Sequence, residues 1–488
     1  MYYNIGGVSY SMIYIDNNAT TQMPPVVMKE MIRWCNMGNP SSGYSSAKSS
    51  RMMMDEFSKA ITTVAKTPGT VGAGKGVGVG VGAKRLGVGA DEGVDEGADE
   101  DADTAADTYT IIFTSGASEG NSTIITSVVD ACLHKRSVNA DSAGITGGIG
   151  SIGSVCNVGG IGNTYRPHII SSAIEHKGLI KTLERLHDLS RVDFTLVKPR
   201  IDGSIHVDDI ESEILPNTVL IAVIGVNNET GVINDIPAII SMAHTHNIPV
   251  HCDAVQSFSK FKITSDSFVF SGHKLHGPPG CGVLAIKKKF ITGYGLSGII
   301  HGTQNGGLRG GTENLPGIGA TYCGLRYSIK THDTKHLLNM KRQLIRGFSG
   351  IMPVISYRKY LQGGIPPRCI VVIGENTVPW TLLFSVVKRD GIIGGDIGEG
   401  SGSDIASTGY ICNVKIKDSL ERHGIIVSVG SACNTSSAHA SHVLYSMGAD
   451  IYIRKGTLRI SLDSSNTTAE ITKVTSCFRE ALREQDVW

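Results

Sequence analysis

Short apolar runs alternate with longer amphipathic segments along most of this chain. Runs rich in β-branched and aromatic residues, bounded by turn-forming residues, predict strands. These runs are Thr110–Phe113, His168–Ser171, Val192–Leu196, Val219–Ile224, Pro249–Cys252, Phe268–Ser271 and Gly282–Ile286. Helices are predicted over Pro25–Cys35, Ser118–Leu133, Lys177–Leu189, Ile236–His246 and His336–Ile345. Because apolar strands that alternate with helices are typical of a mostly parallel sheet covered on both faces, we predict an α/β fold with such a sheet.

Three glycine-rich stretches interrupt this alternation. The longest, Val71–Asp107, begins with glycine alternating with small residues and ends in a run rich in acidic residues. It cannot bury enough apolar side chain to offset the entropy of ordering, so we expect a surface loop. No Gly-Lys-Ser or Gly-Lys-Thr closes it, which argues against a phosphate-binding P-loop. Two further loops are expected at Asp141–Asn163 and Asp390–Thr408.

The overall composition excludes several classes of protein. With 45 basic and 44 acidic residues, the charge balance gives no long-range attraction to nucleic acid or to an anionic membrane. No apolar run is long enough to span a bilayer and the first residues lack a secretory pattern, so we expect a cytoplasmic protein. The ten cysteines form no Cys-x-x-Cys pair, and we expect no metal and no disulfide scaffold. A chain of 488 residues is long enough for two closely joined domains.

Candidate chemistry lies at the ends of two predicted strands. Lys274 closely follows one strand, and Asp253 and Gln256 follow another. A lysine amine can bind an aldehyde cofactor as a Schiff base, and an aspartate can keep a pyridine nitrogen protonated, so these side chains suit pyridoxal 5'-phosphate. Taken alone, Lys274 would more often be a solvated lysine and Asp253 a helix cap. The carboxyl ends of parallel strands form one edge of a sheet, where such groups can meet.

Further motifs surround these residues in a defined order. They are Tyr14–Thr21 (YIDNNATT), Gly38–Ser42 (GNPSS), Phe113–Gly120 (FTSGASEG), Ala173–His176 (AIEH), Val226–Gly231 (VNNETG), Leu308–Thr312 (LRGGT) and Ser428–Cys433 (SVGSAC). Together with Lys274, this series resembles the cysteine desulfurases, the NifS/IscS-like family of the class V aminotransferase group. The resemblance runs from about Tyr14 to about Leu462.

The resemblance implies fold type I of the pyridoxal-phosphate-dependent transferases, with a seven-stranded, mostly parallel sheet in the large domain and a smaller α/β domain. We expect the large domain at 14–325, with a disordered insertion at 67–108 and a loop at 138–164. The small C-terminal domain, 326–488, would carry the loop of the catalytic cysteine, with residues 1–13 packed nearby. The resemblance also implies a homodimer.

The same resemblance implies the residues that bind pyridoxal 5'-phosphate. They are Ala117, Ser118, His176, Asn228, Asp253, Gln256, Ser271, His273, Lys274 and Thr312. Lys274 would carry the cofactor, Asp253 would face the pyridine nitrogen and His176 would stack on the ring. Asn228 and Gln256 would hydrogen-bond the ring substituents. The phosphate would lie at the helix start near Ser118, where backbone N–H groups and the helix dipole favour an anion, and Thr312 would reach it from the partner subunit.

Cys433 separates this family from ordinary class V aminotransferases. The implied catalytic residues are Cys433, Lys274 and His176, and the implied substrate-binding residues are Asn228 and Arg459. In the implied reaction the Cys433 thiolate attacks the sulfur of L-cysteine, which leaves a persulfide on the enzyme and releases L-alanine. An ordinary thiol, with a pKa of about 8.5, is mostly protonated at neutral pH, so Cys433 needs local activation. The sulfur would pass to an acceptor protein, such as an iron–sulfur scaffold, or serve thiolation.

Two other functions are compatible with these motifs. One is a selenocysteine lyase or a related class V enzyme, and the other is a non-catalytic interaction protein that keeps the fold. The cysteine in a glycine- and serine-containing segment argues against a transaminase. The joint presence of Lys274, Asp253, His176 and Cys433 argues against a non-catalytic protein. The chain departs from the family pattern at Gln304–Gly307 and at Asp463-Ser464.

Overall fold

The computed structural model describes residues 2–5, 8–66, 108–141, 165–388, 411–429 and 441–485, with side chains from residue 12 onward except at 136–141. The predicted loops Val71–Asp107 and Asp390–Thr408 lie outside the described residues, as do Cys433 and most of the predicted loop Asp141–Asn163. Among the described helices, none is long and apolar enough to cross a membrane.

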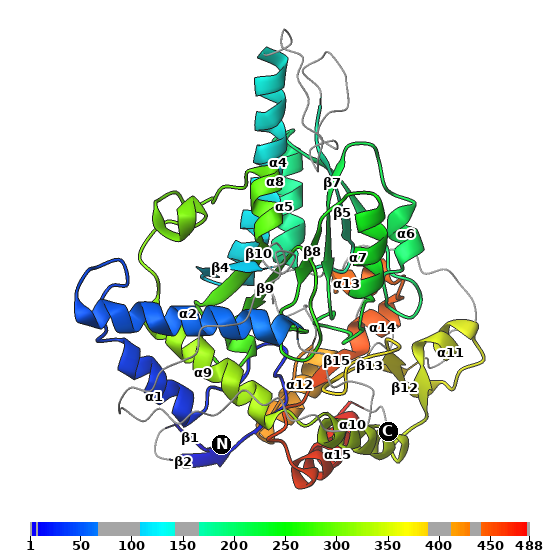
Figure 1. Ribbon diagram of the computed structural model, residues 1–488. Helices are drawn as coiled ribbons and strands as arrows, with labels where there is room; N and C mark the ends of the chain where they lie inside the picture. Colours follow the sequence, from blue (N-terminus) through cyan, green and yellow to red (C-terminus); the bar gives the residue numbers. More distant parts are fainter. Residues whose placement is uncertain are drawn as a thin grey trace.

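A seven-stranded sheet forms the centre of the fold (Figure 1). In spatial order its strands are β4 (Tyr109–Thr114), β10 (Gly282–Lys287), β9 (Ser267–Ser271), β8 (Val250–Asp253), β7 (Thr218–Ile224), β5 (His168–Ser172) and β6 (Asp193–Val197). β10 runs antiparallel to both of its neighbours, and the remaining pairs are parallel. The prediction of a mostly parallel seven-stranded sheet is therefore confirmed, and each predicted strand agrees with the observed one to within a residue at either end.

Helices cover both faces of this sheet. One face packs against α4 (Ala117–Asp141), α5 (Lys177–Asp188) and α8 (Lys288–Tyr294), and the other against α2 (Ser45–Lys66), α7 (Ile236–Thr245) and α9 (Leu315–Thr331). Successive strand residues point to opposite faces, so Phe268 and Phe270 enter one core while Val269 enters the other. Because both faces are buried, these strands are apolar throughout rather than alternating, which is why the sequence pattern identified them.

A second, four-stranded sheet lies beside the first. Its order is β11 (Val354–Ser356), β12 (Arg368–Ile373), β13 (Thr381–Lys388) and β15 (Thr457–Ser461), and only the pair β11 and β12 is parallel. The helices α10 (Thr334–Ser349), α12 (Asn413–Arg422) and α15 (Thr468–Arg483) pack around a core that contains Phe348, Phe384 and Phe478. The N-terminal strand β3 (Ile13–Tyr14) pairs with β14 (Ile425–Ile426) and buries Ile13 and Ile15 in the same core.

The remaining elements connect these layers. They are β1 (Tyr2–Ile5), β2 (Val8–Ser11), α1 (Pro25–Trp34), α6 (Val207–Glu211), η2 (Gly272–Lys274), η3 (Gln304–Gly307), α11 (Tyr357–Gln362), α13 (His442–Ser446) and α14 (Ile451–Gly456). The five predicted helices are present, but α4 continues eight residues beyond Leu133, so residues 138–141 are helical and the loop prediction there was wrong. The predicted domain boundary after Leu325 falls inside α9, and the division into two domains stays a prediction.

Candidate active site

Five strand ends form the edge of the large sheet on which the predicted site residues gather. β4, β9, β8, β7 and β5 point the same way, because β10 is antiparallel to β4 and to β9 alike. The predicted residues follow these strands: Ala117 and Ser118 after β4, His176 after β5, Asn228 after β7, Asp253 and Gln256 at and after β8, and Ser271, His273 and Lys274 at and after β9. The parallel order thus brings sequence-distant side chains to one edge.

Lys274 ends the short helix η2, directly beyond β9. Its Nζ donates hydrogen bonds to the carbonyl oxygens of Asn18 and Ala19, the latter at 2.5 Å. Gln256 Nε2 donates to the same Asn18 oxygen at 3.2 Å. The amine is therefore held in a fixed place by backbone oxygens rather than by a carboxylate.

The charge state of Lys274 is set by its surroundings. Burial lowers the pKa of the Lys274 amine to about 8, and the Arg459 guanidinium acts in the same direction, while Asp16 and Asp253 oppose the shift. Near pH 8 a large fraction of this amine is therefore neutral, which is the form that attacks a carbonyl. Burial, together with the charge of Lys274, also lowers the pKa of His273 to about 4, so that imidazole is neutral.

Asp253 ends a chain of buried hydrogen bonds with a defined direction. Asn121 Nδ2 donates to Asp253 Oδ2 at 2.9 Å, and the backbone N–H of Val255 donates to Oδ1 at 3.1 Å. Because the Asn121 nitrogen donates, its oxygen must accept from His251 Nε2 at 2.8 Å, and Ser267 must donate to His251 Nδ1, also at 2.8 Å. Burial lowers the pKa of His251 to about 3, so the imidazole is neutral, as this chain requires.

Arg459 lies in β15 of the small sheet and points toward the same edge. Its Nη2 forms an ion pair with Asp16 Oδ1 at 2.7 Å, and its Nη1 donates to the Asn228 carbonyl oxygen at 3.0 Å. Both side chains of the pair are largely buried, and the Arg459 Nε finds no partner in the described structure. The guanidinium is thus already oriented toward a carboxylate, although that carboxylate belongs to the chain itself.

The start of α4 meets the end of β9. The backbone N–H of Ala117 donates to Ser271 Oγ at 2.9 Å, and Ser118 is exposed beside it. His176 caps α5, where its Nδ1 accepts from the backbone N–H of Gly178 at 3.1 Å, and its side chain is exposed. The N-termini of α4 and α5 therefore both lie near this edge of the sheet. Backbone N–H groups at helix N-termini favour the binding of an anion.

The segment Asp16–Thr21 lies across the site and joins the two sheets. Asn18 Nδ2 donates to Thr381 Oγ1 of β13 at 2.8 Å and to the Asn228 carbonyl oxygen at 3.1 Å. Thr21 Oγ1 donates to the His273 carbonyl oxygen at 2.9 Å. The motif was recognisable in the sequence, but no role was predicted for its residues. Asn121 and His251 were not predicted, although His251 stands two residues before Asp253 and so shares its face of the strand.

A small cavity of about 40 Å³ adjoins the Lys274 amine. Its walls include Gln256, Lys260 and Asp463. Asp463, which departs from the family pattern, forms an ion pair with His276 at 3.4 Å. Although burial opposes the shift, hydrogen bonds from His276 and Ser465 hold the pKa of Asp463 well below its usual range. The departure at Asp463 therefore adds a fixed negative charge to the cavity wall.

Two predicted residues lie apart from this cluster. Thr312 is exposed in the loop before α9, and nearby Arg309 forms an ion pair with Glu119 at 3.2 Å, which ties that loop to α4. Cys433 lies outside the described residues. The described chain before it ends at Val429, next to Ser428, whose backbone N–H and carbonyl both pair with Arg459 at 3.2 and 2.8 Å.

Comparison with known proteins first defines a class. The sequence profile described as "Aminotransferase class-V" matches residues 163–348, the segment that runs from β5 to α10 and contains Asp253 and Lys274. The chain is 29% identical over 372 residues to a cysteine desulfurase IscS from Buchnera aphidicola, covering 74% of each chain. It is 27% identical over 483 residues to a cysteine desulfurase IscS from Clostridium botulinum, covering 97% of this chain and 95% of the relative.

A solved structure has the same fold. A NifS-like protein superimposes with a TM-score of 0.67 at 23% identity, covering 97% of this chain and all of that protein, and this likeness confirms the fold. By sequence, the chain is thus similar to class V aminotransferases over the matched segment and to cysteine desulfurases of the NifS/IscS-like group over most of its length.

Proteins of this group depend on pyridoxal 5'-phosphate, and the described residues fit that cofactor. Asp253 is only 2% exposed, and its described partners, the Asn121 amide and the Val255 backbone, carry no positive charge. A buried carboxylate without a counter-ion is costly, and a protonated pyridine nitrogen would supply the missing charge. Lys274, with its lowered pKa, would hold the aldehyde carbon, and the helix start at Ala117 would hold the phosphate.

Proposed function

We propose that this protein is a cysteine desulfurase that converts L-cysteine to L-alanine and transfers the sulfur to its own Cys433. The observation that carries the proposal is the meeting of Lys274, Asp253 and Arg459 at one sheet edge in a NifS/IscS-like chain. The reaction balances with one cysteine and one Cys433 thiol on one side, and one alanine and one persulfide on the other. The substrate Cβ–S bond breaks, and an S–S bond to Cys433 Sγ forms.

The proposed roles follow from the contacts of each side chain. When bound, pyridoxal 5'-phosphate supplies an electron sink for the negative charge that develops at the substrate Cα. Arg459 would bind the substrate carboxylate in a two-pronged pair, which requires the Asp16 oxygen to leave Nη2. The neutral Lys274 Nζ would take the Cα proton and return it. Asp253, oriented by Asn121, would keep a proton on the ring nitrogen.

Chain length supports the proposed role of Cys433. The described chain before it ends at Val429, whose neighbour Ser428 is paired with the Arg459 backbone. Four residues of extended chain span at most about 14 Å, so Cys433 stays within that distance of Val429. The described chain resumes at Ser441, which donates a hydrogen bond to the buried Glu229. Both ends of the cysteine-bearing segment are thus fixed close to the residues around Arg459 and Asn228.

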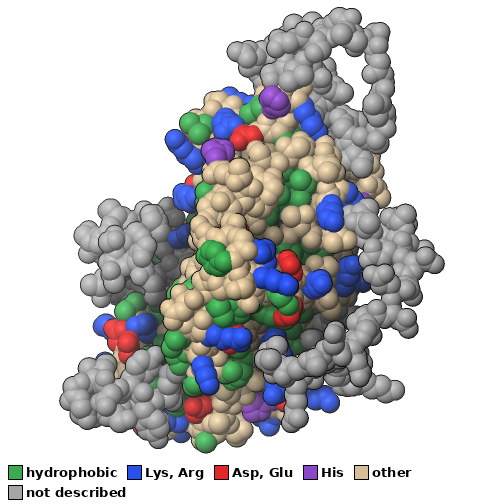
Figure 2. Space-filling view, turned by 60° about the vertical axis from the view of Figure 1, so that its left-hand side comes forward, with side chains coloured by type: hydrophobic (Ala, Val, Ile, Leu, Met, Phe, Trp, Pro, Cys, Tyr) green, Lys and Arg blue, Asp and Glu red, His purple; other side chains and the backbone are tan. Residues whose placement is uncertain are grey.

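We further propose a homodimer, with Thr312 reaching the phosphate site of the partner subunit, and a sulfur-acceptor protein such as an iron–sulfur scaffold. Large apolar side chains stand exposed on α1 and α2, with Val26 54%, Ile32 69% and Met52 53% exposed, and these suit a surface that a second subunit covers. Figure 2 brings this side of the molecule forward and shows apolar side chains scattered among basic ones. The exposed position of Thr312 is compatible with the same interface.

The proposal is tested with purified protein and its Cys433→Ser variant. The wild type should bind pyridoxal 5'-phosphate with a yellow colour and release alanine and sulfide from L-cysteine in the presence of a thiol reductant. Brief exposure to cysteine should add one sulfur to the peptide that contains Cys433, as mass spectrometry can show. Cys433→Ser should give the same colour and the same early spectral change with cysteine, yet no catalytic release of alanine.

The same experiment distinguishes the other functions. A transaminase would be indifferent to Cys433→Ser, and a selenocysteine lyase would turn over selenocysteine while leaving cysteine untouched. A protein that neither binds the cofactor nor changes cysteine would be a non-catalytic relative. Full desulfurase turnover by Cys433→Ser, or added sulfur on another cysteine only, would contradict the assignment of the acceptor sulfur.

A further inference from the structure

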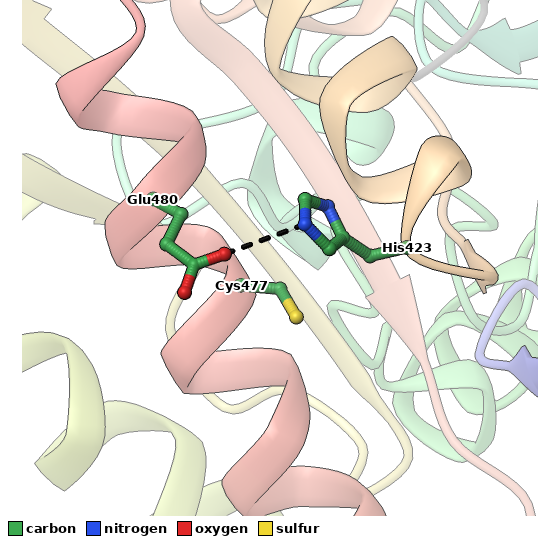
Figure 3. A group of neighbouring side chains, drawn as sticks. All are labelled: His423, Cys477 and Glu480. Carbon is green, nitrogen blue, oxygen red and sulfur yellow. Dashed lines mark ion pairs between the residues drawn. The ribbon is translucent and has the colours of Figure 1, made fainter.

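Three side chains with metal-binding atoms meet on the helical layer of the small sheet. His423 caps the C-terminus of α12, and Cys477 and Glu480 lie three positions apart on α15, so they share one face of that helix. The imidazole nitrogen, the sulfur and the carboxylate oxygen all lie within 4.8 Å of one another. Figure 3 shows the three side chains turned toward the space between the end of α12 and α15. None of them lines the cavity next to Lys274.

The hydrogen bonding of His423 fixes which ring nitrogen is available. His423 Nδ1 lies 2.9 Å from the carbonyl oxygen of Ser419, and a carbonyl only accepts, so Nδ1 carries a hydrogen. The other nitrogen, Nε2, faces Glu480 Oε2 at 3.3 Å. At that distance a lone pair on Nε2 would repel the lone pairs of the Glu480 oxygen. The two atoms are therefore compatible only with a proton on Nε2 or with a metal ion between them. With a proton there, Cys477 only packs in the core beside this pair, whereas a metal ion would engage all three atoms.

We propose that His423, Cys477 and Glu480 bind a divalent transition metal ion, zinc in the first place, with water as the fourth ligand. Imidazole, thiolate and carboxylate are the ligands that zinc prefers, and the thiolate disfavours magnesium and calcium. Zinc bond lengths place tetrahedral ligand atoms roughly 3.3–3.6 Å apart, so the His423–Glu480 distance of 3.3 Å already fits. The Ser419 carbonyl supplies the outer hydrogen bond that orients histidine ligands.

Two further features favour a cation here. The C-terminus of α12, where His423 lies, carries the negative end of the helix dipole. Cys477 is 6% exposed, so its sulfur is near the surface yet shielded from most solvent. Because the ligands are the thiolate and the unprotonated Nε2, binding releases the Cys477 thiol proton and also any proton held between His423 Nε2 and Glu480, so protons should leave as the ion binds near pH 7.

An ion at this place would join α12 to α15 at the start of the segment that approaches the active site. His423 is followed by Gly424, at φ +73°, and then by β14, which pairs with the N-terminal strand β3. The same segment continues to Ser428, the backbone partner of Arg459. The ion would therefore fix His423, where the segment that continues through β14 toward Cys433 begins. The proposal itself rests on the three ligands alone and is independent of the catalytic function.

Cobalt and zinc binding to the full-length protein test the proposal. Co²⁺ added under reducing conditions should give the near-ultraviolet charge-transfer band of a cobalt–thiolate bond together with visible bands of a tetrahedral ion. Equilibrium dialysis should find one more tightly bound Zn²⁺ in the wild type than in Cys477→Ser. The His423→Gln and Glu480→Gln variants should each bind that ion at least about tenfold more weakly.

Two control variants make the result specific. Cys35→Ser removes an exposed cysteine at the C-terminal end of α1. His246→Gln breaks another surface histidine–glutamate pair, in which His246 Nε2 lies 3.0 Å from Glu211 Oε1 and which is not part of a described cluster with a cysteine. Both should keep the cobalt band and the extra zinc ion, and zinc should raise the melting temperature of both but not of Cys477→Ser. Equal zinc binding by wild type and Cys477→Ser, or a cobalt spectrum without the thiolate band, would overturn the proposal and leave a plain His423–Glu480 ion pair.

Discussion

Two buried lysines, one at the edge of each sheet region, show how different surroundings give the same pKa. Lys274, beyond β9, and Lys341, in α10, both have an amine pKa lowered to about 8. For Lys341 burial is the cause, and its Nζ donates to Thr377 Oγ1 at 2.7 Å and to the Val378 carbonyl oxygen at 2.9 Å. For Lys274 burial acts together with the charges of three neighbouring side chains.

The difference lies in what each amine faces. Lys341 closes a loop of the small sheet, and its two acceptors leave it little freedom to do anything else. Lys274 adjoins a cavity that also has Gln256 and Lys260 in its wall, and it lies near Asp253, a buried carboxylate that forms no ion pair in the described structure. A lowered pKa therefore marks burial, since burial also lowers the pKa of Lys260, in the same cavity wall, to about 8. The position of Lys274 directly beyond β9 and near Asp253 is what distinguishes it.

The largest expected effect separates these two lysines. Lys274→Ala should abolish cysteine turnover and the borohydride-reducible cofactor adduct, because it removes the amine that the Asn18 and Ala19 carbonyl oxygens hold beyond β9. Lys341→Met should keep both and lose only stability, by about 1–3 kcal/mol, because the acceptors of Lys341 are left unpaired. Peptide mapping after reduction and thermal unfolding measure the two outcomes. An adduct found on Lys341, or retained in Lys274→Ala, would break the comparison.

The pH dependence of cofactor binding tests whether the pKa of the Lys274 amine is lowered. At pH 8 an amine with a pKa of about 8 is half neutral, whereas one at 10.5 is almost fully protonated, a difference of roughly 150-fold in the reactive form. The rate at which the apoprotein regains its cofactor absorbance should therefore rise up to about pH 8 and then level off. Free lysine, measured in parallel, should still be rising at pH 10. A protein rate that follows free lysine would show that the Lys274 pKa is ordinary.

A smaller effect on cofactor affinity is expected for Asn121, which contacts Asp253. Asn121→Ala removes the amide that orients Asp253 and leaves His251 without its acceptor, so the free protein should bind pyridoxal 5'-phosphate about tenfold more weakly. Fluorescence titration of the apoprotein gives this affinity without any assay of turnover. Asn314→Ala is the matched control, because it removes an asparagine that caps α9 away from Asp253. Equal losses in the two variants would mean that Asn121 acts only through stability.

The smallest effect is expected for the long glycine-rich segment. Replacing residues 71–107 by a short linker should leave cysteine turnover within about threefold, a change of less than about 1 kcal/mol in the barrier. The composition of the segment cannot build a core, and loop-closure entropy changes slowly with length. Kinetics of the shortened protein provide the measurement. Loss of cofactor binding would show that this segment belongs to the site.

The large sheet could be predicted because its strands are buried on both faces and are therefore apolar along their whole length. α2 was missed although Met53, Phe57, Ile61 and Val64 form an apolar stripe along it. Small and polar residues, such as Ala47 and Ser50, fill the buried face only in its first turns. No strand of the small sheet was predicted, although β13 is as apolar as the strands of the large sheet.

The site residues were predictable to the extent that motifs carry them. Lys274 and Asp253 lie in recognisable segments at strand ends. Asn121, inside a helix, and His251, inside a strand, become visible only when two elements meet across the sheet. The ion pair between Asp16 and Arg459 joins residues 443 positions apart, a separation at which sequence spacing carries no information about contact.

That long-range closure has a consequence for how the protein is made. The backbone N–H of Asn17 and that of Asn18 both bond to Ser461, and β3 pairs with β14, so these contacts of the N-terminal region cannot form before residues more than 400 positions later are made. A nascent chain on the ribosome can complete β4 to β10 of the large sheet, but it cannot form the ion pair of Arg459 until synthesis has passed that residue. The substrate-binding site is therefore completed only after residues 459–461 have been synthesised, and a chain that stops before them stays without it.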